Sequence, residues 1–108
     1  MRKVPLRFQE FSRQNPRVSE AYEDLSAECR DAGPLNEKER CLVKLGIAIG
    51  SGMEGAVRSQ VRKGLDAGLK PEEIRHAFLL GLPCIGFPRM MAALTWAEDV
   101  LEKDEPGA

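Results

Sequence analysis

Apolar residues recur at helical spacing along most of this chain, and glycine and proline separate the apolar segments. The stripe from Val18 to Cys29 recurs at intervals of four, three and four residues, which places it on one side of a helix. We expect this helix to begin at Asn15-Pro16, with Asn15 as its cap, and to end at Gly33-Pro34. No segment alternates polar and apolar residues as a strand does, so the pattern predicts an all-α fold.

The next predicted helix is apolar around most of its circumference. It covers Cys41 to Gly50, a stretch with a single charged residue. Asn36 followed by Glu39 predicts a capping box at its start. A helix without a polar face is central in a fold, so we expect it to be packed on several sides. Gly46 and Gly50 lie four residues apart and would let another helix approach closely.

A third helix is expected from about Met53 to Ala67, ending at Gly68. A fourth is expected to start at Lys70-Pro71, where proline suits the first turn and two glutamates follow. Pro83, together with Gly86 and Pro88, is expected to interrupt the chain before the last helix. The predicted inward positions of these three helices are Met53, Ala56 or Val57, Gln60 or Val61, and Gly64; Ile74, Ala77, Phe78, and Leu80 or Gly81; and Met91, Leu94, Ala97 or Glu98, and Leu101.

A length of 108 residues predicts one domain with one modest core. We expect an N-terminal arm over residues 1–14, a helical domain over 15–103 and a flexible tail over 104–108. The apolar side chains of the arm would pack it onto the helical domain or onto a neighbouring subunit.

Composition excludes several classes of function. The 16 Lys and Arg nearly balance the 17 Asp and Glu, so neither nucleic acid nor an anionic membrane is an expected partner. No apolar run approaches the roughly 18 residues of a membrane span, and the N-terminus has no signal-peptide pattern. Three separated cysteines and a single histidine predict neither a disulfide scaffold nor a metal site, and they suit a reducing cytoplasm.

Residues 35–101 resemble the carboxymuconolactone decarboxylase and alkylhydroperoxidase D-like family. The resemblance rests on four ordered segments, 35–40, 55–68, 69–74 and 86–101. It implies a helical bundle with a central helical hairpin and a homo-oligomer, a trimer or a hexamer, with its pocket near a subunit interface. It also implies a peroxidase or a decarboxylase that acts on a small organic molecule without a cofactor.

The reactive residues of that family are replaced in this chain. The peroxidase branch carries a CxxC pair and, four residues later, a histidine, which correspond here to Met53, Ala56 and Gln60. The upstream glutamate corresponds to Cys41. Methionine forms no thiolate and glutamine accepts no proton, so the two-thiol mechanism is not expected. A decarboxylase would also miss its histidine at Gln60 and would have only Glu54 nearby.

Seven residues remain as candidates, and each has a purely structural alternative as a packing, capping or surface residue. The candidate catalytic residues are Gln60, Glu54, Cys41 and Cys84, and the candidate binding residues are Met53, Ala56 and His76. Two hypotheses follow. The chain is an enzyme of the family with an altered site beside Gln60, Glu54 and Cys41, or a catalytically decayed oligomer that binds a ligand or serves as a scaffold.

Overall fold

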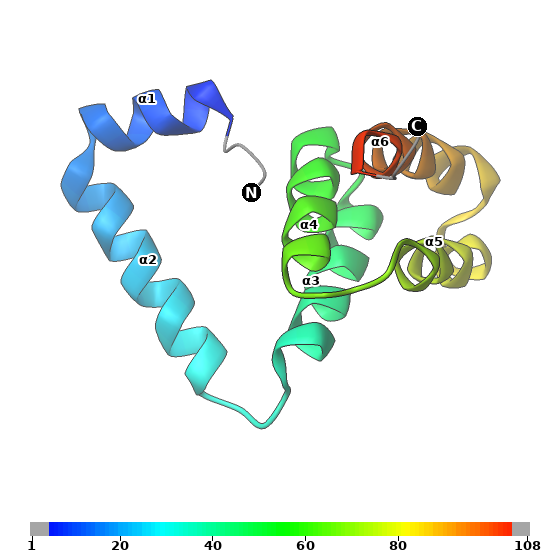
Figure 1. The fold of residues 1–108 in the computed structure, drawn as a ribbon, viewed down its shortest axis with the longest axis horizontal. Helices are drawn as coiled ribbons and strands as arrows, with labels where there is room; N and C mark the ends of the chain where they lie inside the picture. The colour runs from blue at the N-terminus through cyan, green and yellow to red at the C-terminus, as the bar shows by residue number, and fades with distance from the viewer. Residues whose placement is uncertain (1–4, 105–108) are drawn as a thin grey trace. The chain divides into compact units, whose positions relative to one another are not determined.

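The computed structural model describes residues 5–104, and every regular element in that range is a helix, as predicted (Figure 1). The six helices are α1 (Leu6–Gln14), α2 (Pro16–Asp31), α3 (Glu37–Ser51), α4 (Glu54–Asp66), α5 (Pro71–Ile85) and α6 (Phe87–Asp104). The predicted arm therefore contains a helix of its own. The predicted tail, apart from Asp104, lies outside the described residues.

The chain divides into two units after Leu35. The first unit contains α1 and α2, which contact each other. The Ser12 and Ser19 hydroxyl oxygens are 2.9 Å apart and link the two helices. No residue of either helix is buried, so the stripe from Val18 to Cys29 is exposed.

Asn15 is the N-cap residue of α2, as predicted, and its carbonyl oxygen accepts from the Ser19 N–H at 3.0 Å, but the expected side-chain cap is absent. The Asn15 side chain makes no cap to α2. Instead, its amide nitrogen donates to the Phe11 carbonyl oxygen at 3.2 Å, and its backbone N–H donates to the same oxygen at 2.8 Å. Asn15 therefore closes the last turn of α1, because that carbonyl would otherwise lack a donor.

The second unit contains α3 to α6 packed around one hydrophobic core. Helices α3 and α4 form a hairpin joined by Gly52 and Met53 (Figure 1). Helix α5 packs against α3 and α6, and α6 packs against α4 and α5. The core consists of Leu45, Ala48, Ile49, Val57, Val61, Leu69, Ile74, Phe78, Met90, Ala93, Ala97 and Leu101.

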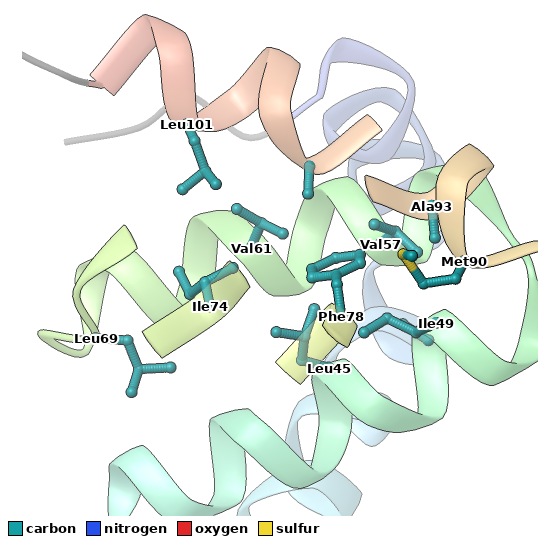
Figure 2. Packing of buried hydrophobic residues seen from close by; sticks show 12 residues of the cluster. Leu45, Ile49, Val57, Val61, Leu69, Ile74, Phe78, Met90, Ala93 and Leu101 are labelled. Atoms are coloured by element: carbon teal, nitrogen blue, oxygen red, sulfur yellow. The ribbon is translucent and has the colours of Figure 1, made fainter. Parts of the chain in front are cut away.

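Phe78 occupies the middle of this core. Figure 2 shows its ring between Val57 of α4 and Ile49 of α3. The predicted inward stripes of α4 and α5 are confirmed at Val57, Val61 and Gly64 and at Ile74 and Phe78. The inward position predicted for Met53 is wrong, because Met53 lies in the turn before α4 and is 63% exposed. The predicted stripe of α6 is shifted at its start, since Met90 is buried and Met91 is 45% exposed.

Two helix ends of the hairpin are closed as their sequences indicate. Asn36 and Glu39 form the predicted capping box, with both hydrogen bonds at 2.9 Å. Gly52 ends α3 with φ 68°, a left-handed conformation that glycine adopts without strain. The Arg89 guanidinium lies against Gly52 and donates to the Gly50 carbonyl oxygen at 3.3 Å. A side chain at position 52 would displace Arg89 from this helix end.

The expected interruption before the last helix lies at Gly86, between α5 and α6, but α5 continues through Pro83 to Ile85, so the break expected at Pro83 itself is wrong. Pro83 removes one helical hydrogen bond and lies in the last turn of α5, where little helix follows that its ring could disrupt. The Gly86 N–H donates to the Leu82 carbonyl oxygen at 3.0 Å and closes that turn. Leu82 and Ile85 pack against the core, which holds this end of the helix in place.

None of the helices within residues 5–104 is both long and apolar enough to cross a membrane.

Candidate functional site

The positions that correspond to the expected reactive residues lie on the α3–α4 hairpin. Cys41 on α3 faces α4, because its sulfur is 4.0 Å from the Lys63 carbonyl oxygen. Lys63 lies about one helical turn after Gln60. Met53 caps the start of α4 and is 63% exposed, whereas Ala56 packs against the core. Cys41 and Ala56 are therefore engaged in helix packing, whereas Met53 lies exposed at the turn of the hairpin.

Cys41 has an environment that disfavours its thiolate. Burial raises the pKa of the Cys41 thiol, and the negative charge of Glu37 raises it further. The nearby cations, Lys44 first among them, oppose that effect without reversing it. Cys41 is therefore a protonated thiol at neutral pH and a poor nucleophile.

We expect this environment to slow alkylation of Cys41. At neutral pH, iodoacetamide should modify Cys29 and Cys84, which are both exposed, faster than Cys41. Because the pKa of Cys41 is raised, its reaction should accelerate only at a more alkaline pH than an ordinary cysteine requires. Mass spectrometry of peptides after timed labelling measures all three rates. A Cys41 rate equal to that of Cys29 would contradict the assignment.

Gln60 carries an unusual feature on α4. Its Oε1 atom is buried and has no hydrogen-bond partner among the described residues. A buried amide oxygen normally accepts a hydrogen bond, since leaving it unpaired is unfavourable by about 1–3 kcal/mol. The oxygen is thus available to a donor that the described residues do not supply.

Glu54 is engaged in an ion-pair network on the surface of α4 and α6. Its carboxylate accepts from Arg58 Nε at 2.9 Å, and Arg58 Nη2 donates to Asp99 at 2.9 Å. The hydrogen bond to Asp99 is the main cause that raises the pKa of Arg58. Arg58 therefore links α4 to α6 through Asp99, and Glu54 is paired with the same guanidinium, which weakens the case for Glu54 as an acid or base.

A groove of about 470 Å³ lies between α3 and α5, away from the expected position. Two sequence candidates, Cys84 and His76, line it, whereas Gln60, Glu54 and Cys41 do not. Met53 and Ala56, the other two candidates on the hairpin, do not line the groove either. The full lining is Leu42, Gly46, Ile49, Gly50, Glu73, His76, Ala77, Leu80, Gly81, Cys84 and Ile85.

Glycines open this groove. A Cβ atom on Gly46 or Gly50 would have no described atom within 4 Å apart from the neighbouring backbone of α3, so no other element fills the space beside either glycine. At Gly81 the Cβ would lie 3.6 Å from Ile49, where α5 approaches α3. The close approach of another helix that was predicted at Gly46 and Gly50 is not found among the described residues, and the groove itself was not predicted from the sequence.

The polar groups of the groove do not form a catalytic pair. Cys84 and His76 lie eight residues apart on α5, about 12 Å along the helix axis, which is beyond direct proton transfer. The Cys84 sulfur lies 3.7 Å from the Leu80 carbonyl oxygen. Glu73 accepts from the Lys70 backbone N–H at 2.8 Å and so caps the start of α5. The arrangement suits binding better than nucleophilic chemistry.

No group of three metal-ligating side chains occurs within the part of the chain that the structure describes.

The sequence profile described as "Carboxymuconolactone decarboxylase family" matches residues 16–99, which extend from the start of α2 into α6. Comparisons with curated proteins and with solved structures give no match.

Proposed function

Because this chain belongs to the carboxymuconolactone decarboxylase family, we propose that it is a homo-oligomer that binds a small organic molecule in the α3–α5 groove. The groove itself carries this proposal. Its volume of about 470 Å³ falls within the roughly 300–1,000 Å³ of small-molecule pockets. The family's reactive positions hold residues without the required chemistry, which supports binding over two-thiol catalysis.

The groove walls define the class of ligand. Most of the lining is aliphatic or glycine, and the polar side chains are Glu73, His76 and Cys84. An imidazole both donates and accepts hydrogen bonds, so His76 suits a hydroxyl, carbonyl or carboxylate group. The expected ligand is a compact apolar molecule with one polar group. The three free cysteines support a reducing, cytoplasmic location.

Ligand-observed NMR tests the proposal with a panel of small aromatic and aliphatic carboxylic acids, alcohols and ketones. We expect saturation transfer to several compounds that carry an apolar body and a single polar group. Compounds of the same polarity without the apolar body serve as controls. Absence of transfer to every member of the panel would contradict a small-molecule site.

We expect no dithiol-dependent consumption of hydrogen peroxide by the purified protein. The two-thiol reaction needs a reactive thiolate, a resolving thiol and a base on one helix face, whereas α4 offers Met53, Ala56 and Gln60. The assay compares the wild type with Cys84→Ser and Cys41→Ser, and all three should equal the rate without protein. Turnover that either substitution removes would instead establish a relocated thiol mechanism.

A second candidate function rests on the unpaired Gln60 oxygen. A substrate hydroxyl or acid proton would satisfy it, as in an enzyme of the family with an altered site on the α3–α4 hairpin. Release of carbon dioxide from carboxymuconolactone tests this candidate. Activity lost in Gln60→Ala but retained in Ser59→Ala, its neighbour on α4, would favour the enzyme. No release from the wild type would exclude this substrate.

A further inference from the structure

The polar side chains of the α3–α5 groove are unevenly distributed along it. Glu73 and His76 lie three residues apart in the first two turns of α5, so they share one side of the helix and lie together at one end of the groove. Beyond them, only the weakly polar thiol of Cys84 interrupts a lining of aliphatic side chains and glycine. The groove therefore has one polar end and an apolar remainder.

Glu73 has an acceptor that the protein does not use. One of its carboxylate oxygens accepts from the Lys70 backbone N–H at 2.8 Å. Within residues 5–104, no hydrogen bond or ion pair engages the second oxygen, and none engages the His76 ring. A carboxylate accepts hydrogen bonds and donates none. The polar end of the groove therefore favours a ligand group that donates a hydrogen bond.

The charge at this end of the groove is negative. Glu73 is the single acidic residue among those that line the groove, and none of them is lysine or arginine. The start of α5 carries the equivalent of about half a positive elementary charge, which the carboxylates of Glu72 and Glu73 together exceed. Lys38 of α3 lies instead against Gly68, in the turn before α5. A ligand carboxylate at this end would therefore be repelled.

We propose that the groove binds a ligand whose polar group is a hydroxyl or an ammonium directed at Glu73 and His76, and that Glu73 discriminates against carboxylates. His76 alone would accommodate a carboxylate, so Glu73 is the residue that sets the specificity. The apolar body of the ligand extends from this end toward Gly81, eight residues and about 12 Å further along α5. The inference rests on the proposed function, because it names the ligand class of the same groove.

Three compounds with one apolar body test the ligand class on the wild-type protein. Naphthylethanol, naphthylethylamine and naphthylacetate differ in their terminal group, and NMR titration at neutral pH gives their dissociation constants. We expect the alcohol and the amine to bind about fivefold more tightly than the carboxylate, because a charge contact at an exposed side chain such as Glu73 has an effect of this order.

The outcomes separate the inference from the proposed function. A carboxylate that binds as tightly as the alcohol, or more tightly, would overturn the inference and leave the groove as a small-molecule site. Absence of binding by all three compounds would overturn the inference as well. Absence of binding across the earlier panel too would remove the proposed function.

Glu73→Gln tests the residue that sets the specificity. Glutamine at this position keeps the capping box, since its amide oxygen also accepts from the Lys70 N–H. The substitution removes the negative charge, so the gap between alcohol and carboxylate should narrow to about twofold or less, mainly because the carboxylate binds more tightly. An unchanged gap would overturn the role of Glu73.

Glu72→Gln is the matched control. It removes the same charge from the same turn of α5, but at a residue that does not line the groove. This variant should keep the preference of the wild type for the alcohol and the amine. Equal narrowing in Glu72→Gln and Glu73→Gln would assign the effect to the net charge of the helix start and overturn the contact with Glu73.

Discussion

Replacing Phe78 by alanine is expected to destabilise the protein by about 3–5 kcal/mol, the range observed for removal of a buried aromatic ring. Phe78 is fully buried between α3 and α4 (Figure 2). Its ring contacts the hairpin from α5, so the cavity would open where three helices meet. A domain of this size is stable by about 5–15 kcal/mol, so the loss would be a large fraction of the total.

Urea unfolding followed by circular dichroism measures this loss. Phe87→Ala is the matched control, since Phe87 is 63% exposed and its removal should change stability by about 0.5 kcal/mol or less. All variants are compared at one low protein concentration, because association would add its own stabilisation. Equal losses at both positions would contradict the described core.

Gly46→Leu is expected to weaken ligand binding without harming the fold. A Cβ at position 46 meets nothing within 4 Å among the described residues, so a leucine side chain can extend into the groove. Replacing glycine within a helix by leucine should also raise the propensity of α3, by up to about 1 kcal/mol. We expect affinity for any groove ligand to fall at least about tenfold, which corresponds to about 1.4 kcal/mol.

Gly55→Leu is the matched control for this substitution. Gly55 lies on α4, a Cβ there also meets nothing within 4 Å, and the residue does not line the groove. Isothermal titration calorimetry with the strongest compound of the NMR panel compares the two variants. Wild-type affinity in both variants would place the ligand elsewhere. The same loss of affinity in both variants would indicate a general effect on folding.

The sequence predicted helix starts correctly where the signal depends only on residues within one helical turn. The capping box at Asn36 and the proline start of α5 at Pro71 are both present. The predicted side-chain cap of Asn15 is absent because two helices meet at this residue. Its side chain bonds to the end of α1 and so cannot also cap α2. The helix break predicted at Pro83 is absent because the destabilisation of a helix by proline depends on position. The last turn of α5 tolerates the residue.

The candidate site was less accessible to sequence reasoning. The family resemblance directed attention to Gln60 and Cys41, which the structure places along the α3–α4 hairpin. The groove depends on how α3 meets α5, a contact between segments about thirty residues apart in the sequence. Gly46 and Gly50 predicted the close approach of another helix, whereas in the structure both glycines line the open groove.

Titration of the isotope-labelled protein with the strongest ligand of the panel, followed by amide chemical shifts, tests the central claim most directly. The account predicts the largest shifts at Gly46, Gly50 and Gly81, the three glycines of the groove. Shifts confined to the start of α4, around Ala56 and Gln60, would contradict it and return the site to the position of the family's reactive residues.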